Sequence, residues 1–295
     1  MDAIWLDDYL ALAVTLNFSR AAERRNVTQP AFSRRIRALE RWVGTDLFVR
    51  TTHSVAMTAA GAKFRDQAEM LARTIQQVRR DTLAVAERQT HALTVAATHV
   101  LSFTFFPAWI RRNDDLFGRG HLKLISDTMA ACEDILARGD AQFLLCHHHP
   151  DAPVHFDASR FRSALVGDDT LIAVSAPDSD GLPVWAIGGK APIDYLEYGE
   201  TSGLGRIISS AMRDTALSRR FRPVFTSHLA ATLLTMARSG AGLAWLPMTL
   251  AADDLRDGRL VRAGGASCEI PLQIRLFRPL ARQSDAAEGV WSAIA

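Results

Sequence analysis

Apolar residues recur with a helical period at the start of the chain, over residues 5–16, and predict an amphipathic first helix that ends at Asn17. Ser19 is a favourable N-cap for a second, short helix that runs to Arg25. After a tight turn, Thr28 is placed to cap a third helix. Short helices joined by a tight turn are typical of a helix-turn-helix.

The third helix has two distinct faces. Its apolar residues follow one another at spacings of 4, 3 and 4 and form one stripe: Phe32, Ile36, Leu39 and Val43. The opposite side carries Ser33, Arg34, Arg37 and Arg41. Such a helix suits the major groove of DNA, where arginine reads guanine edges or binds phosphates. A solvated basic face on an ordinary helix would produce the same pattern, so the neighbouring segments decide the interpretation.

Residues 44–57 favour the DNA-binding interpretation. They have the pattern of a strand, a basic polar turn and a second strand, which can form a wing along a DNA backbone. Residues 17–53 also contain eight arginines against three acidic residues, a balance of +5. Residues 1–90 carry +4 and the remaining chain carries −2, so the whole-chain charge of +2 averages two segments of opposite sign.

Five motifs occur here in order: FSRAA at 18–22, VTQPAFSRRI at 27–36, LE at 39–40, LFVR at 47–50 and TAAG at 58–61. In sequence and spacing they resemble the winged helix-turn-helix of LysR-type transcriptional regulators. The resemblance implies DNA contacts from the helices through Ser19, Arg20, Thr28, Gln29, Pro30, Ser33, Arg34 and Arg37. It implies wing contacts to the backbone or minor groove through Arg50, Thr51 and His53. The wing tip departs from many relatives in lacking a further arginine.

The next segment, residues 59–90, has a heptad pattern. Mostly apolar positions alternate at spacings of 4 and 3 over about three heptads: Phe64, Ala68, Leu71, Ile75, Val78, Thr82 and Val85. A period of 3.5 favours a helix paired with another helix over one packed on its own domain. The resemblance implies the linker helix of a homodimer, which would hold two DNA readers at the separation that a two-fold operator requires. We further expect a homotetramer, formed through the lobes that follow.

Beyond residue 90, short apolar strands alternate with helices, which predicts βαβ units and a mostly parallel sheet. Strands are expected at 93–97, 122–125, 143–146, 171–174, 223–226 and 272–277, and helices at about 105–112, 132–138, 204–213 and 229–239.

The resemblance implies that these elements form a two-lobed, periplasmic-binding-protein-like effector domain. The predicted fold class is therefore α+β and multi-domain, with a winged helix-turn-helix, a linker helix and an α/β effector domain. The expected bounds are 1–58, 59–90 and 91–295, with lobe I at about 91–164 plus 267–295 and lobe II at about 165–266.

Polar residues follow three of the expected strands, at the carboxyl ends where α/β folds bind small molecules. The candidates are Thr98, His99, Ser102, Thr201, Ser202, Ser227 and His228. Hydroxyls and free N–H groups at helix starts suit a carboxylate or another anion. Ordinary N-caps and loop histidines are the alternatives.

The run Cys146-His147-His148-His149 raises the question of a metal site. In an extended chain only His147 and His149 could share one ion, and no further ligand motif accompanies them. We therefore interpret the run as a polar strand end and add His147 to the effector candidates. No metal and no cofactor are expected. The chain also lacks Gly-x-Ser-x-Gly and a phosphate-loop lysine, so an enzyme is not expected.

Composition excludes several other classes. The chain has 295 residues, 48% hydrophobic and 22% charged, which is unlike disordered, collagenous or disulfide-rich proteins. Its three scattered cysteines fit a reducing compartment. The first residues are acidic where a signal peptide needs positive charge, and no apolar run approaches the roughly 18 residues of a membrane span. These features predict a cytoplasmic protein without membrane partners.

The sequence thus predicts a sequence-specific DNA-binding regulator, modulated by a small-molecule effector or oxidant in the inter-lobe cleft. Expected partners are double-stranded operator DNA, an anionic effector and, for an activator, RNA polymerase. The alternative is a small-molecule-binding protein or enzyme with an N-terminal helical oligomerisation segment. Within the family the chain resembles the hypochlorite-responsive regulators. The positions aligned with their sensing methionines are Asn113, Leu204 and Leu229, so the resemblance does not extend to that sensor.

Overall fold

The computed structural model describes residues 2–50, 55–85, 93–117, 121–152, 154, 156, 160–189, 191–213, 215 and 217–295. The chain divides into two compact units, one of Met1–Gln89 with Ala137–Gly139 and one of Thr90–Leu136 with Asp140–Ala295. The N-terminal unit and the C-terminal unit have separate hydrophobic cores.

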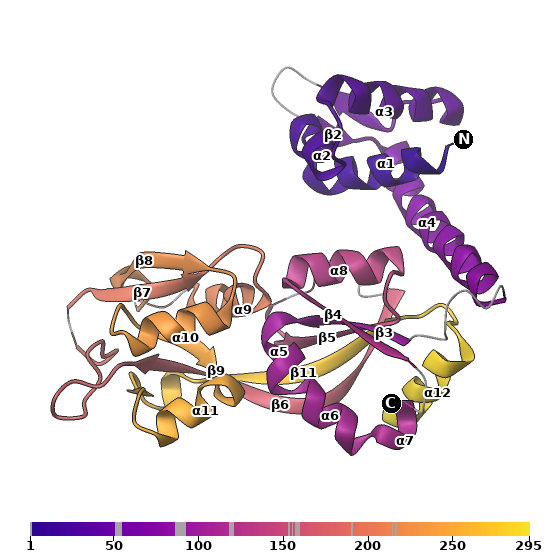
Figure 1. Cartoon of the computed structure of the whole chain (residues 1–295). Helices are drawn as coiled ribbons and strands as arrows, with labels where there is room; N and C mark the ends of the chain where they lie inside the picture. The colour runs from indigo at the N-terminus through magenta and orange to yellow at the C-terminus, as the bar shows by residue number, and fades with distance from the viewer. Residues whose placement is uncertain are drawn as a thin grey trace. The chain divides into compact units, whose positions relative to one another are not determined.

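The N-terminal unit is a winged helix-turn-helix followed by a long helix (Figure 1). Three helices precede the wing, and their core contains the predicted apolar stripe, since Phe32, Ile36 and Leu39 are fully buried. Leu12 and Tyr9 of the first helix pack in the same cluster. The elements are α1 (Ala3–Thr15), α2 (Phe18–Arg24), α3 (Gln29–Val43), β1 (Phe48–Arg50), β2 (Val55–Met57) and α4 (Ala59–Val85).

The start of α2 differs from the expectation. Asn17, not Ser19, is the N-cap: its side-chain oxygen accepts from the backbone N–H groups of Ser19 and Arg20, both at 3.0 Å. Asn17 has extended backbone angles and a carbonyl that reaches two of the amides left unpaired at a helix start. Thr28 does occupy the N-cap position of α3, but its hydroxyl makes no capping hydrogen bond.

The expectation of a mostly parallel sheet in the C-terminal unit is wrong. β3 (Leu93–Thr98) pairs in parallel with β4 (Leu122–Asp127) and β5 (Phe143–His148). The remaining pairs in the main sheet are antiparallel: the long β11 (Ile270–Pro279) pairs with β5 and with the long β6 (Phe161–Ser175), and β6 also pairs with β9 (Ala244–Pro247) and β10 (Val261–Arg262). The strand order is β10-β6-β11-β5-β3-β4, with β9 also on β6. A separate parallel pair consists of β7 (Ile193–Tyr198) and β8 (Phe221–Ser227).

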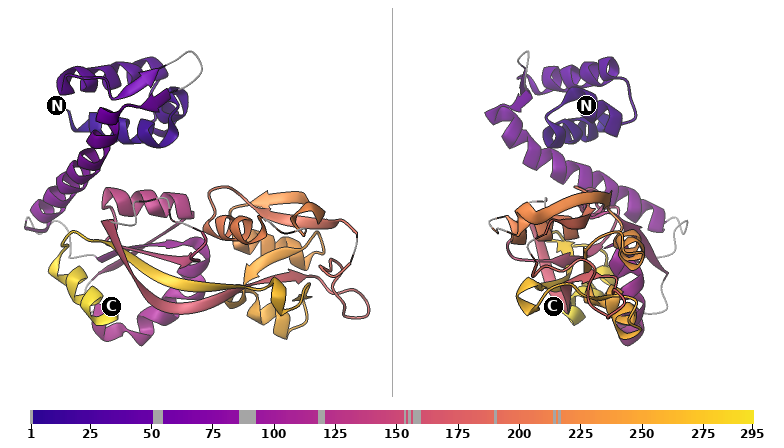
Figure 2. Two further views of the ribbon diagram at one scale, coloured as in Figure 1. Left: turned by 180° about the vertical axis from the view of Figure 1, so that it is seen from behind. Right: turned by 90° about the vertical axis from the view of Figure 1, so that its left-hand side faces the viewer.

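β6 and β11 connect the two parts of the C-terminal unit. Figures 1 and 2 show β3–β5 with α8 toward one end of this strand pair and β7–β9 with α9 and α10 toward the other. The register of the pair shifts between Ile274 and Arg275. Near this shift lies Gly167, where an added Cβ would be 2.8 Å from the Phe105 ring. One continuous cluster of buried side chains extends through both parts.

Helices flank both sheets. The expected helix over 105–112 begins one residue later, because Phe105 separates two short helices. No helix in the described part of the chain is long and apolar enough to cross a membrane. The helices are α5 (His99–Thr104), α6 (Phe106–Arg112), α7 (Asp114–Phe117), α8 (Met129–Arg138), α9 (Gly203–Met212), α10 (Ala230–Arg238), α11 (Met248–Arg256) and α12 (Asp285–Ile294).

Candidate functional site

The exposed face of α3 carries most of the predicted DNA contacts. Arg34 and Arg37 are exposed, and Ser33 between the two faces is half-buried. Neither arginine has an acidic partner among the described residues. The remaining helical candidates are also on the surface: Ser19, Arg20, Thr28, Gln29 and Pro30. Thr51 and His53 lie outside the described residues.

Two other arginines of this basic segment are bound inside the N-terminal unit. Arg25 donates to Asp8 at 2.8 Å, and Arg35 approaches the same carboxylate at 3.4 Å. The Asp8 side chain is fully buried on α1, so it links α1 to the end of α2 and to α3. Asp8 was not a sequence candidate. The sequence could have indicated it, because a carboxylate on the same side of α1 as the buried Leu12 needs a basic partner.

Arg50, predicted to contact DNA, is also held within the unit. It donates to Glu40 Oε2 at 3.0 Å and to Ser33 Oγ at 3.4 Å, and its guanidinium lies 4.6 Å from the centre of the Phe18 ring. Glu40 is only 7% exposed, and its Oε1 accepts from the backbone N–H groups of Leu47 and Phe48, at 3.1 and 3.2 Å. This pair therefore anchors β1 on α3.

The predicted seam on α4 separates into two parts. Ala68 is fully buried in the core of its own unit, and Phe64 packs edge-on against Tyr9 at 4.9 Å between ring centres. Ala68 therefore has no surface left for a partner helix, and its assignment to the seam is wrong. Leu71, Ile75 and Val78 are 39%, 42% and 59% exposed and form the α4 apolar stripe. Thr82 is exposed too, and the side chain of Val85 lies outside the described atoms.

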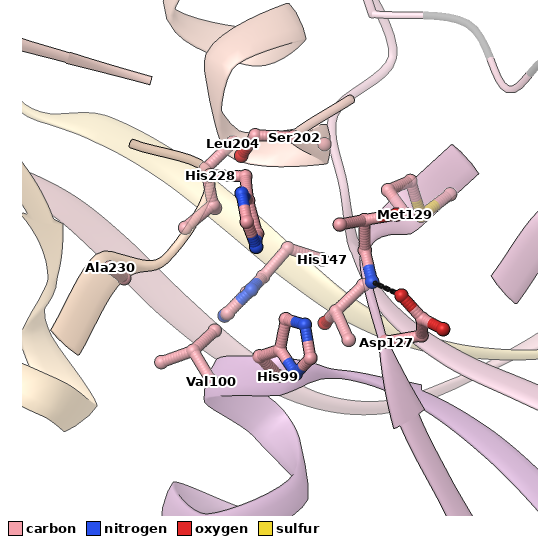
Figure 3. Close-up of a pocket in the computed structure, with 12 residues that line it drawn as sticks. His99, Val100, Asp127, Met129, His147, Ser202, Leu204, His228 and Ala230 are labelled. Carbon is pink, nitrogen blue, oxygen red and sulfur yellow. Dashed lines mark hydrogen bonds between the residues drawn. The ribbon is translucent and has the colours of Figure 1, made fainter. Parts of the chain in front are cut away.

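In the C-terminal unit, five effector candidates surround one cavity of about 30 Å³: Thr98, His99, His147, Ser202 and His228. The cavity lies where β3, β4 and β5 end and where α8, α9 and α10 begin. Figure 3 shows the imidazoles of His99, His147 and His228 turned toward one another, with Ser202 above them. We call this cavity the cleft pocket.

His147 is the most buried of the three histidines, at 6% exposure. Its Nε2 lies 3.1 Å from Asp169 Oδ2, and its Nδ1 is buried without a hydrogen-bond partner among the described atoms. Asp169 also accepts from the hydroxyl and the amide of Thr249, at 2.6 and 3.2 Å, and from the amide of Thr170 at 2.8 Å. Burial opposes ionisation of Asp169, but the hydrogen bonds from His147, Thr249 and Thr170 outweigh it and hold the pKa of this carboxyl below its usual value.

The other members of the cleft pocket differ in their hydrogen bonding. His99 Nδ1 lies 3.0 Å from Ser126 Oγ, and its ring centre is 6.0 Å from that of His228. Ser202 is an N-cap, which was the alternative to a ligand contact, since its Oγ accepts from Gly205 N at 3.3 Å. Thr98 precedes α5 without capping it, and its buried Oγ1 has no partner among the described atoms.

Three effector candidates lie outside the lining of the cleft pocket. Ser102 donates to the carbonyl of His99 at 2.6 Å. Ser227 Oγ accepts from the amide of Leu229 at 3.1 Å, and Thr201 is exposed. Ser102 Oγ also lies 2.9 Å from Ser126 Oγ, the hydroxyl that contacts His99, so this candidate supports the pocket without lining it. Asp169 and Thr249, which support His147, were not predicted because they are far from it in sequence.

The Cys-His-His-His run has no metal-binding arrangement in the structure as described, where no group of three potential ligands is placed to hold an ion. Burial raises the pKa of the Cys146 thiol well above its ordinary value, which opposes the thiolate that a metal needs. The ring of His148 packs 5.9 Å from that of Phe277.

Comparison with known proteins decides the family. The profile of bacterial regulatory helix-turn-helix proteins of the lysR family matches residues 5–62, and that of the LysR substrate binding domain matches residues 86–295. The chain belongs to the LysR family. It is a LysR-type DNA-binding transcriptional regulator with an effector-binding domain.

Several relatives match this LysR-type regulator over nearly their full length. The regulator YjiE of Escherichia coli is 31% identical over 291 residues, covering 97% of this chain and 92% of its own. The structure of DarR from Vibrio fischeri in complex with DNA is 29% identical, with a TM-score of 0.57 and coverage of 100% and 98%. Full-length HypT of Salmonella typhimurium, described as hypochlorite-specific, is also 29% identical, with a TM-score of 0.59 and coverage of 99% and 96%.

These matches weigh against an enzyme, because the named relatives are transcriptional regulators. They do not single out the hypochlorite-responsive subgroup, since DarR is as similar to this LysR-type regulator as HypT is.

Proposed function

We propose that α3 of this regulator reads operator DNA in the major groove, and that the cleft pocket binds a small anionic effector that shifts the protein between two conformations. The observation that carries the DNA half is the division among the arginines. Arg25, Arg35 and Arg50 bind carboxylates of their own unit. Arg34 and Arg37 face outward on the helix, available for phosphates or guanine edges.

Replacement of Arg34 or Arg37 by alanine is expected to weaken operator binding by about 1–3 kcal/mol each. A residue that reads a base should reduce the preference for operator over scrambled DNA. A residue that binds only phosphate should weaken both equally and reduce the salt dependence. Fluorescence anisotropy at several salt concentrations measures both quantities. Arg162→Ala, at an exposed position of the C-terminal unit, makes the same charge change and should leave affinity unchanged. Parent-like affinity in both α3 variants would reject this assignment.

We also propose that the α4 apolar stripe pairs with its equivalent on a second copy. Leu71, Ile75 and Val78 recur at helical spacing and expose large apolar surface, which a partner helix would cover. Such pairing would place two α3 helices on one palindromic site. The proposal also includes the association of dimers into a homotetramer. It includes a cytoplasmic location as well, with which the three free cysteines agree.

Ile75→Glu is expected to shift the protein toward lower mass at equal concentration, because it puts a charge into the paired surface. Light scattering across a dilution series measures the effect. Ile75→Leu keeps the apolar surface and should keep the parent mass. If Ile75→Glu and Ile75→Leu have the same mass as the parent at every dilution, α4 is not the dimer contact.

Two features support the effector half of the proposal. The cleft pocket gathers a buried hydroxyl and three imidazoles where parallel strands end. The helices α8, α9 and α10 also begin at the pocket, so their partial positive charges favour an anion. Oxidant sensing of the kind implied by the description of HypT has less support, since Asn113, Leu204 and Leu229 stand where methionines would be expected.

A further inference from the structure

The protonation state of His147 follows from its partner. The Asp169 carboxylate accepts three hydrogen bonds from Thr170 and Thr249, so it is ionised and can only accept. The Nε2 atom of His147, 3.1 Å away, must therefore carry the hydrogen. In a neutral imidazole the other nitrogen then has a bare lone pair. That atom, Nδ1, is the buried one without a partner, in a ring that lines the cleft pocket.

The cleft pocket has no fixed positive side chain in its lining. No lysine or arginine is among the described residues that form it. Arg206 lines a neighbouring cavity, and both of its terminal nitrogens bind Glu133, at 3.1 and 2.8 Å. The carboxylate of Asp127 lines the pocket, but it accepts from the amide of Thr128 at 2.7 Å and in Figure 3 it turns away from the imidazoles. Besides the partial charges of the helix starts, a full positive charge in this lining can come only from histidine protonation.

We propose that the cleft pocket binds a compact anion together with one proton, held between the ligand and Nδ1 of His147. This inference rests on the proposed function of the pocket as the effector site. Nδ1 repels an anion while it bears a lone pair, and it donates to the anion once protonated. A neutral acid that donates its own hydrogen to Nδ1 gives a complex of the same composition. In both forms the proton cancels the charge of the anion, so binding adds no net charge to the pocket; in the ionic form Asp169 also stabilises the imidazolium.

The volume and chemistry of the pocket select the ligand class. At about 30 Å³ the cavity is small and suits a compact anion of a few non-hydrogen atoms. Thr98 and Ser202 also line the pocket, and each has a hydroxyl hydrogen that could be donated to an anion. His99 and His228 are the remaining titratable groups facing His147 across the pocket, and they are the competing sites for the proton.

Formate is a suitable probe, because it is an anion of three non-hydrogen atoms. Calorimetry of formate binding to the full chain at pH 8, repeated in buffers of different ionisation enthalpy, measures proton uptake. We expect about one proton per formate, and affinity that falls about tenfold per pH unit above pH 8. Binding without proton uptake overturns the inference and leaves the anion pocket standing. If formate, nitrate and acetate all fail to bind between pH 6 and 8, the pocket assignment fails and this inference with it.

Three variants assign the proton. His147→Gln cannot titrate but keeps an N–H donor, so we expect weak binding with proton uptake near zero. Asp169→Asn removes the balancing charge and should lower affinity at pH 8 by tenfold or more. Thr98→Val removes a hydroxyl without a partner, so it should weaken binding and leave uptake at about one proton. Uptake of a full proton by His147→Gln would assign the proton to His99 or His228 and overturn the role of His147.

Discussion

Gly61→Ala is expected to destabilise the N-terminal unit by about 3–5 kcal/mol, a large effect for one methyl group. A Cβ at this position would lie 2.1 Å from the backbone oxygen of Leu47 and 3.1 Å from its carbonyl carbon. Neither atom belongs to a flexible side chain. The methyl group can be accommodated only if the start of α4 moves away from the segment before β1.

Hydrogen bonds on both sides of Gly61 oppose that movement. Its carbonyl accepts from the buried Tyr9 hydroxyl at 2.6 Å, and its amide donates to Thr58 Oγ1 at 2.9 Å. Burial raises the pKa of Tyr9 to about 12, so the phenol remains a donor at any ordinary pH. A shift of α4 would break one or both contacts and leave buried polar atoms unpaired.

Urea unfolding followed by circular dichroism, with an operator-binding assay, measures the outcome for Gly61→Ala. Gly289→Ala is the matched control, because Gly289 lies within α12 and an added Cβ there meets no atom within 4 Å. That change should be neutral or stabilise by up to about 1 kcal/mol through helix propensity. If Gly61→Ala unfolds at the same urea concentration as the parent, the contact with Leu47 does not exist in solution.

Glu40→Ala is expected to cost about 3 kcal/mol and to lower operator affinity even where the variant stays folded. The substitution leaves the amides of Leu47 and Phe48 without their acceptor and Arg50 without its carboxylate. β1 then loses its anchor on α3, so the wing no longer has a defined position relative to the recognition helix.

Glu40→Gln separates the two contributions. The amide oxygen of glutamine can still accept from Leu47 and Phe48, whereas the charge that binds Arg50 is gone. We expect this variant to lose about half as much stability as Glu40→Ala, roughly 1–2 kcal/mol, by thermal and urea unfolding. A loss below 0.5 kcal/mol for Glu40→Ala, in the same range as an ordinary surface change, would contradict the anchoring role.

Local periodicity predicted the parts of the fold whose contacts are close in sequence. The stripe of Phe32, Ile36 and Leu39 is buried as expected, because a spacing of 4 and 3 places side chains on one helix face whatever packs against it. The cap of α2 was misplaced by two residues, since Asn17 and Ser19 are both good capping residues and backbone conformation chooses between them.

Contacts between distant residues were not predictable in this way. Arg50 has the same sequence signal whether it binds phosphate or a carboxylate, and only the position of Glu40 decides. The return of residues 267–295 to the first lobe was expected, but not the direction of pairing: β11 is antiparallel to β5 and β6, and β6 is antiparallel to β9 and β10. In the cleft, the position of His147 at a strand end indicated this residue. Thr249, however, is 80 residues from Asp169. No local pattern therefore indicates the hydrogen bonds that decide which nitrogen of His147 carries the hydrogen.

The internal pairing of Arg25, Arg35 and Arg50 has a consequence for how the protein searches a genome. Residues 17–53 carry a formal balance of +5, which already counts Glu40, the partner of Arg50; Asp7 and Asp8, outside this range, pair with Arg25 and Arg35 and lower the charge that faces DNA further. Fewer counterions are then released on random DNA than the sequence charge suggests, so the protein spends less time on wrong sites. If α3 reads the operator as proposed, discrimination depends on the arginines that remain outward, and on their geometry more than on their number.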